Sequence, residues 1–148
     1  MQAIILCGPA GTGKTALYRD RWLETHVRLN LELMHGLERE GVHFTTCLET
    51  RQDFVVDDRN ATPADRARYA VPAREAGYLV VCCLVDGASK GTRAGAQPPA
   101  RIPAPPSLIA GPRFVAPTAA EGFDEIMRAR PDPDGGWAIE EIAPPAVL

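Results

Sequence analysis

The sequence contains very little lysine. Among its 16 basic residues only Lys14 and Lys90 are lysines, and all the others are arginines. The 19 acidic residues outnumber the basic ones, so the net charge of −3 gives no electrostatic reason to expect nucleic acid as a partner. It does not exclude one, because local basic patches can act within an acidic protein. Since lysine is so scarce, its presence in a glycine-rich stretch is consistent with a specific role for Lys14.

Long apolar runs and cysteine patterns typical of metal sites are also lacking. No run approaches the roughly 20 residues of a membrane span, and residues 1–7 are too short for a signal peptide. The cysteines at positions 7, 47, 82 and 83 lack metal-ligand spacing, so we interpret them as small buried residues in a reducing compartment. These absences predict a soluble, cytoplasmic protein. The length of 148 residues predicts a single domain over 1–148.

The most specific motif is the stretch GPAGTGKT, which directly follows the apolar run AIILC. It matches the pattern G-x-x-x-x-G-K-[ST] in full and lies between a predicted strand and a predicted helix, as a phosphate-binding loop does. Its glycines let the backbone turn so that successive N–H groups face inward. The motif predicts a nucleotide site formed by Gly8, Pro9, Ala10, Gly11, Thr12, Gly13, Lys14 and Thr15.

Two residues of this loop carry the expected chemistry. Lys14 is expected to reach the β- and γ-phosphates of a nucleoside triphosphate, and the Thr15 hydroxyl is expected to ligate Mg²⁺. The structural alternative is a glycine-rich turn without a ligand. The guanine-reading motif N-K-x-D is absent, which weighs against a GTPase, and the chain is short for a motor core. We therefore expect a phosphotransferase that uses ATP and Mg²⁺.

The remaining pattern predicts an α/β domain. Apolar stretches predict strands at 2–7, 26–31, 53–58 and 78–86. Helices are predicted at 14–25, at 32–40 and 42–52, which are joined or kinked at Gly41, and at 62–77, with Thr62, Pro63 and Gly77 as end signals and a kink at Pro72. This order predicts the P-loop kinase fold, with a mainly parallel central sheet and helices on both faces.

The chain after Asp86 is rich in Gly, Ala and Pro. In a kinase this is where a mobile lid would lie, so we predict a short lid at about 87–105, with a surface loop as the structural alternative. Residues 107–114 are compatible with a short helix. Two strands within 123–142, around the turn PDPDGG, predict a C-terminal hairpin.

Three further stretches resemble the phage-type polynucleotide 5′-hydroxyl kinases and their bacterial P-loop kinase relatives. FVVDDRNATPADRARYAVPAREAGYLVVCCLVD is similar to that family's V-V-D-x-T-N-x-(T/P)-x-x-R segment with its following helix and strand. RIPAPPSLIAGPRF looks like the helix after the lid, and APTAAEGFDEI is similar to the P-T-x-x-E-G-F-D-E-(I/V) tail. The resemblance covers nearly the whole chain. It implies transfer of the γ-phosphoryl group of ATP to a hydroxyl, typically the 5′-hydroxyl of DNA or RNA.

The resemblance also implies roles for individual residues. The position of the family's general base, an Asp, is occupied by Glu32, and that of a phosphate-binding Arg by His35. Arg93 matches a lid arginine that stabilises the transferring phosphoryl group, and a second lid arginine would fall near Gln97, with Arg101 as a possible substitute.

The family's D-x-T-N stretch is kept in part. Asp57 and Asn60 match it, Arg59 stands at the Thr, and Asp58 adds a second acid; we predict that Asp57, Asp58 and Asn60 face the substrate.

Each of these residues also has a purely structural interpretation. Glu32 suits the first turn of a helix, His35 a solvated surface, and Arg93 a loop. Asp57 and Asp58 could cap the helix that begins at Thr62.

Other residues are interpreted as structural in the first place. Arg66, Arg68 and Arg74 are expected on a solvated helix face. Phe123 and Trp137 are expected in the core rather than as platforms for a base.

Three functions follow in order of preference. The first is an ATP-dependent kinase of polynucleotide 5′-hydroxyls, in which Lys14, Thr15 with Mg²⁺, and Arg93 neutralise charge while Glu32 orients or deprotonates the acceptor, with Asp57 or Asp58 in reserve. The second is a kinase of another hydroxyl, on a nucleoside, a small alcohol or a hydroxymethylated base in DNA. The third is a regulatory module that binds ATP without catalysis.

Overall fold

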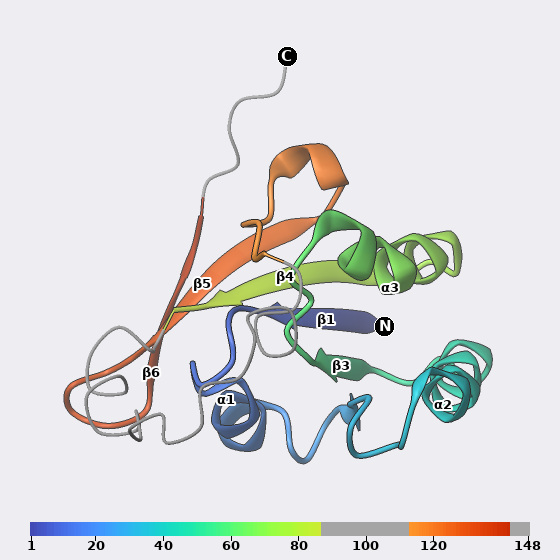
Figure 1. Cartoon of the computed structure of the whole chain (residues 1–148), viewed down its shortest axis with the longest axis horizontal. Coiled ribbons are helices and arrows are strands. Elements are labelled where there is room, and N and C mark those ends of the chain that lie inside the picture. The colour runs from blue at the N-terminus through green and yellow to red at the C-terminus, as the bar shows by residue number, and fades with distance from the viewer. Residues whose placement is uncertain (87–112, 143–148) are drawn as a thin grey trace, which may run out of the picture.

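The computed structural model describes residues 1–86 and 113–142, which form one six-stranded sheet. Its strands are β1 (Gln2–Cys7), β2 (Val27–Leu29), β3 (Phe54–Asp57), β4 (Leu79–Val85), β5 (Glu125–Pro131) and β6 (Trp137–Glu141). Their order is β2-β3-β1-β4-β5-β6, and every neighbouring pair is parallel except β5 with β6 (Figure 1). The mainly parallel sheet and the terminal hairpin predicted from the sequence are confirmed.

Strand β1 lies at the centre of the sheet and explains why its sequence is apolar throughout. It pairs with β3 on one side and β4 on the other, and Ala3 to Cys7 are all buried. A parallel strand covered on both faces has no solvent side, so it does not alternate apolar with polar residues. The register places Leu6 beside Asp57, so the acid that ends β3 lies where β1 enters the glycine-rich loop.

Three helices cover the two faces of the sheet. Helix α1 (Lys14–Arg21) packs Leu17 and Tyr18 into one core, which also takes the inner side of the terminal hairpin. Helices α2 (Leu37–Thr50) and α3 (Pro63–Glu75) pack against the other face, around Phe54, Tyr69 and Tyr78. Helices on both faces were predicted and are confirmed. None of the helices in the described ranges combines the length and apolarity that a bilayer crossing requires.

The expected helix at 32–40 is wrong in its first half. Residues 31–35 form turns, and α2 begins only at Leu37. The physical reason lies in the backbone: His35 and Gly36 have φ values of 61° and 120°, outside the helical region. The Asn30 side chain also caps this turn, because its Oδ1 accepts a hydrogen bond from the Leu33 N–H at 2.7 Å. Helix α2 then runs through Gly41 without the predicted junction.

Helix α3 begins as its sequence predicts. The Thr62 hydroxyl accepts a hydrogen bond from the Asp65 N–H, and the Asp65 carboxylate accepts one from the Thr62 N–H, which together form a capping box. The partner of Thr62 is thus Asp65, and the alternative role of Asp57 and Asp58 as caps of this helix is not used. Pro72 lies inside the helix, which ends before Gly77 in the left-handed region.

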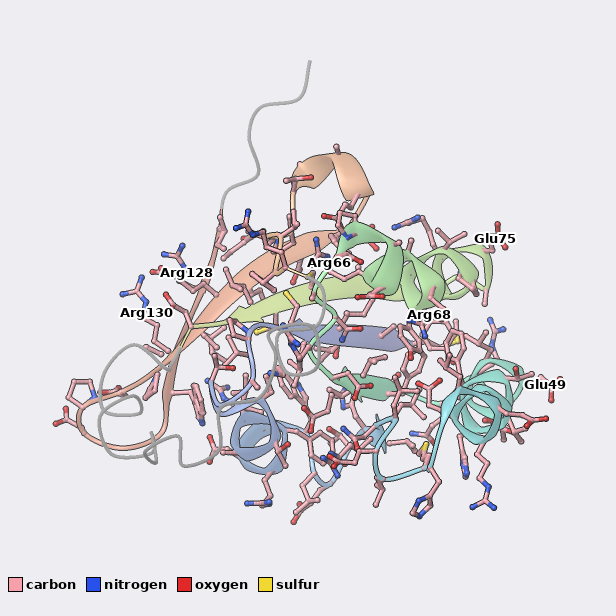
Figure 2. The ribbon with its side chains drawn as sticks, viewed as in Figure 1. Glu49, Arg66, Arg68, Glu75, Arg128 and Arg130 are labelled. Carbon is pink, nitrogen blue, oxygen red and sulfur yellow. The ribbon has the colours of Figure 1, made fainter. Side chains whose placement is uncertain are left out.

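Arg66 corrects a second expectation. It shares helix α3 with Arg68 (Figure 2), but its side chain is fully buried, whereas that of Arg68 is 40% exposed. Its Nε and Nη2 donate to the two carboxylate oxygens of Glu121, both at 2.9 Å, and its Nη1 donates to the Asn60 carbonyl at 2.8 Å. The long arm of arginine, three residues before Tyr69 in the buried face of α3, makes this inward path possible.

This link ties three segments together. Glu121 belongs to a short 3-10 helix (Ala119–Glu121) whose start it also caps, and Asn60 lies in the loop after β3. Arg66 therefore joins α3, the tail segment and the loop beside β1 through one guanidinium group.

We expect Arg66→Met to lower the free energy of unfolding by about 3–5 kcal/mol, because it leaves the Glu121 carboxylate half-buried without its cation. Arg68→Met is the matched control on the same helix, and its exposed ion pair should contribute less than about 1 kcal/mol. Urea denaturation of both variants measures the difference. Equal stability of the two variants would contradict this account.

Candidate functional site

The glycine-rich loop between β1 and α1 has the shape that its sequence predicts. Gly8, Gly11 and Gly13 all have positive φ, at 148°, 84° and 96°. At Gly8 a side chain is also excluded by space, because a Cβ atom there would lie 2.8 Å from the Val85 carbonyl oxygen. The Gly8 N–H donates to the Arg59 carbonyl at 3.0 Å, which fixes the start of the loop against the segment after β3.

Lys14 lies folded back into this loop. Its side chain is buried, and Nζ donates to the Gly8 and Pro9 carbonyls at 3.0 and 2.9 Å. Burial lowers the pKa of the ammonium group, and the nearby Asp57 carboxylate partly offsets this. A phosphate in the loop would supply the negative charge that favours the protonated form.

Thr15 contacts the acid at the end of β3. Its hydroxyl donates to Asp57 Oδ2 at 2.8 Å, and Asp57 is buried. Arg28 in the middle of β2 completes the group: its Nε donates to the same Oδ2 at 2.8 Å, and its Nη2 lies 3.4 Å from the Thr15 hydroxyl. Loop, β3 and β2 therefore meet at one hydrogen-bonded cluster.

The Thr15 and Asp57 oxygens fit the donor set of Mg²⁺. Hard oxygen ligands suit this ion, which usually takes one or two protein groups and completes its shell with phosphate oxygens and water. Over residues 1–86 and 113–142, no three His, Cys, Asp or Glu side chains come together as a metal cage. A magnesium ion would thus be held here together with a nucleotide.

Asp58 lies next to this cluster and anchors the turn after β2. Its carboxylate accepts hydrogen bonds from the Asn30 side chain at 3.1 Å and from the Leu31 N–H at 3.3 Å. Asn30 also donates to the Asp57 carbonyl at 2.6 Å. The pKa of the Asp58 carboxyl is raised to about 7, mainly by burial and also by the neighbouring acids Asp57 and Glu40, while the hydrogen bond from Leu31 and the charge of Arg28 oppose the rise.

Asn60 reaches the other side of the loop. It is buried with φ of 45°, and its Nδ2 donates to the Leu6 carbonyl at 2.6 Å. This hydrogen bond holds the end of β1 from the loop after β3, and Arg66 in turn holds the Asn60 carbonyl. Asn60 is thereby placed beside the phosphate-binding loop, with its amide turned to the backbone.

The structure does not bring Glu32 and His35 into the cluster around Thr15. Both are exposed on the turn at 31–36, and within the described ranges neither side chain has a hydrogen bond or ion pair. Arg93 and Gln97, together with Arg101 and the predicted lid, fall outside the described residues. Their expected roles stay predictions.

Trp137 lies against the loop as well as in the core. Like Met127 and Ile139, it packs against the core on the α1 side of the sheet. Its ring also lies close to the loop, because a Cβ atom on Gly13 would be 3.0 Å from it. The sequence favoured a core residue, which is confirmed in part, because the ring is only half-buried. Phe123 likewise packs at the edge of the opposite core.

Arg28 and Asn30 are the site residues that sequence reasoning missed. For Asn30 a signal was available, because it lies at the carboxyl end of a predicted parallel strand, where binding groups of such sheets gather. Arg28 lies in the middle of β2, and its role depends on Asp57, a partner 29 residues away that the local pattern does not reveal.

Comparisons with known proteins support the fold. No protein-family model matches the sequence, and no curated protein matches it. A structure from the PezAT chromosomal toxin–antitoxin system of Streptococcus pneumoniae is similar, with a TM-score of 0.52 and 15% identity over 93% of this chain and 70% of that one. At this identity the likeness shows the fold alone, and it confirms the predicted α/β class with a mainly parallel central sheet.

Two structures of the APS kinase of Mycobacterium tuberculosis are more distant. The complex with AMPPNP and APS has a TM-score of 0.49 and 17% identity, covering 88% of each chain. A cysteine-to-alanine mutant has a TM-score of 0.41 and 17% identity, covering 57% of this chain and 75% of that one.

The raised pKa of Asp58 predicts a pH-dependent stability. A carboxyl whose pKa is higher in the folded state stabilises the fold at low pH and loses that contribution as pH rises toward about 7. Asp58→Asn removes the ionisation, and its amide oxygen can keep the place of Oδ1 toward Asn30 and Leu31. Relative to wild type, we expect the variant to gain on the order of 1–3 kcal/mol between pH 5 and pH 8.

The measurement is urea denaturation of both proteins at the two pH values, in EDTA so that no metal binds beside Asp58. A stability difference that does not change with pH would show that Asp58 ionises normally.

Proposed function

We propose that the chain is an ATP-dependent phosphotransferase that moves the γ-phosphoryl group to a hydroxyl. One observation carries the proposal: a complete phosphate-binding loop ends in Lys14 and Thr15, and the Thr15 hydroxyl lies 2.8 Å from the buried carboxylate of Asp57. A loop alone would bind phosphate, but the added threonine–aspartate pair suits the magnesium ion of a nucleoside triphosphate. The resemblance to polynucleotide kinases and the fold both agree with this chemistry.

The described residues would share the work as follows. Loop N–H groups and Lys14 bind the β- and γ-phosphates, and Thr15 with Asp57 would hold Mg²⁺, which neutralises charge as the phosphoryl group moves. The bond from the γ-phosphorus to the bridging oxygen breaks, ADP leaves with that oxygen, and the acceptor oxygen bonds to phosphorus. Arg28 places a further positive charge beside Thr15.

The acceptor's proton must pass to a base, and two carboxylates qualify. Glu32 stands where the related kinases have their Asp, but its side chain is exposed on the turn after β2. Asp58 directly follows Asp57 and lies at the edge of a pocket beside the cluster. A base must come within hydrogen-bond reach of the proton it takes, and this geometry favours Asp58.

The natural acceptor is the finer part of the proposal. The D-x-x-N segment and the E-G-F-D tail favour a polynucleotide 5′-hydroxyl through their resemblance to that family. The acids at 32, 38 and 58, and His35 in place of the phosphate-binding arginine, favour a different hydroxyl, because a nucleic-acid strand needs cations along its backbone. Either acceptor would receive its phosphoryl group from ATP bound by the same residues, the glycine-rich loop with Lys14, Thr15 and Asp57.

We expect Lys14→Ala to abolish ATP-dependent phosphorylation, with a loss of at least about 100-fold in kcat/KM, because no other described lysine can reach the γ-phosphate. Arg19→Ala, on the exposed side of α1, is the matched control and should behave like wild type. The assay follows ³²P transfer from labelled ATP to a panel of hydroxyl acceptors that includes 5′-hydroxyl oligonucleotides. Tight ATP binding without transfer to any acceptor would favour a regulatory module and overturn the proposal.

The two carboxylates can be separated by matched amides. Asp58→Asn should lower kcat about 100-fold or more while ATP binding is kept, as for loss of a general base, and Glu32→Gln should change kcat less than about three-fold. Single-turnover rates with saturating ATP and the best acceptor of the panel measure both. The reverse ranking would assign the base to Glu32, as the resemblance implies.

A further inference from the structure

We infer that Arg28 acts as a built-in cation at the phosphate end of the nucleotide site and takes over part of the role of Mg²⁺, so that nucleotide binding by this chain depends only weakly on the metal. The inference rests on the proposed function and deepens it. It concerns how the site balances the charge of the phosphates, which the sequence motif of the loop does not determine.

The position of Arg28 in the sheet explains how its side chain reaches the loop. In the parallel pair of β2 with β3, Arg28 lies beside Val55, which belongs to the core on the α1 side and comes two residues before Asp57. Side chains two residues apart on a strand point to the same face of the sheet, about 7 Å from each other. The long arm of arginine spans this separation, and its guanidinium meets Asp57 beside Thr15.

Arg28 binds the same oxygen atoms that would hold Mg²⁺. Its Nε donates to Asp57 Oδ2 at 2.8 Å, and its Nη2 donates to the Thr15 hydroxyl at 3.4 Å. The Thr15 hydroxyl in turn donates to the same Oδ2 at 2.8 Å. A carboxylate oxygen accepts about two hydrogen bonds, so Oδ2 already has its full set. A metal ion bound to Oδ2 would have to replace one of these two donors.

The pair of Arg28 with Asp57 is largely shielded from solvent. The side chain of Arg28 is 25% exposed and that of Asp57 only 2%. A buried carboxylate without a cation is costly, so Asp57 keeps Arg28 until another positive charge takes its place. Mg²⁺ therefore has to compete with a preformed ion pair, and this lowers the affinity of the site for the metal.

The guanidinium of Arg28 also suits phosphate oxygens. It has five N–H donors in a planar fork, and the hydrogen bonds to Asp57 and Thr15 use two of them. The β- and γ-phosphates are expected beside the Thr15 hydroxyl, so the remaining N–H groups can donate to a phosphate oxygen there. The fixed positive charge of Arg28 thereby offsets part of the phosphate charge that Mg²⁺ would otherwise balance.

Nucleotide binding with and without metal tests this inference. Isothermal titration of the full chain with AMPPNP, a non-hydrolysable ATP analogue, is carried out in EDTA and in excess MgCl₂. For the wild type we expect the metal to tighten binding less than about ten-fold. Arg28→Gln removes the charge but keeps a polar group, and it should weaken binding in EDTA about ten-fold, as for the loss of a hydrogen bond between charged groups.

The metal should reverse the effect of this substitution. Without Arg28 the oxygens of Asp57 and Thr15 are open to Mg²⁺, so in MgCl₂ the affinity of Arg28→Gln for AMPPNP should lie within about two-fold of wild type. Arg28→Lys keeps the charge and should stay within about three-fold of wild type in both buffers. A residue with a merely structural role would instead weaken binding by the same factor with and without metal.

Arg19→Gln is the matched control. It makes the same change on the exposed side of α1, the helix that begins at the loop. It should bind AMPPNP like the wild type in both buffers. Urea denaturation checks that each variant is folded under the conditions of the titration.

The outcomes separate this inference from the proposed function. If the metal tightens AMPPNP binding to the wild type more than about ten-fold, or if Arg28→Gln loses the same factor in both buffers, Arg28 does not take over a role of the metal and the inference is overturned. The wild-type titration decides this even if Arg28→Gln does not fold. If binding follows the expected pattern but no acceptor of the panel is phosphorylated, the role of Arg28 stands and the phosphotransferase function falls. Failure of the wild type to bind AMPPNP in either buffer would overturn both.

Discussion

The site depends on the way the central strand β1 ends. Strand β1 is buried on both faces, and at Gly8 the chain turns so closely past β4 that the Val85 carbonyl leaves no room for a side chain. After this turn the chain passes through the loop, and α1 begins at Lys14. Because β3 and β4 flank β1 in parallel, their carboxyl ends deliver Asp57 and its neighbours to the same edge.

A buried polar network holds this edge in place. Glu121, Arg66 and Asn60 form a continuous path from the tail segment to the Leu6 carbonyl, one residue before Cys7 ends β1. A buried charge is costly unless it is paired and hydrogen-bonded, and the Arg66 guanidinium binds the Glu121 carboxylate through two N–H groups and the Asn60 carbonyl through a third. The tail of the chain thereby contributes to the geometry of a loop more than a hundred residues earlier in the sequence.

The sequence predicted those parts that depend on local chemistry. The motif GPAGTGKT, the apolar strands and the capping signal at Thr62 each determine a short segment, and each was located correctly. Residues whose role depends on distant partners were not found in this way. Arg66 reads as one of several helix arginines, and only the fold shows that it faces Glu121. The turn at 31–36 looked helical because its deciding feature, the anchoring of Asn30 and Leu31 by Asp58, joins segments 27 or more residues apart.

The two halves of the site are therefore built by different means. The part that would bind ATP relies on the backbone N–H groups of the glycine-rich loop. Gly8, Gly11 and Gly13 have positive φ values that other residues rarely adopt, so this part keeps a recognisable sequence motif. The residues next to the loop that could face an acceptor lie on the turn after β2 and just after β3, where Asp58 holds Asn30 and Leu31 through side-chain hydrogen bonds. A chain of this fold can thus keep its phosphate chemistry while its acceptor changes. The departures from the polynucleotide kinase pattern, at Glu32 and His35, accordingly lie on the turn after β2 and not in the loop.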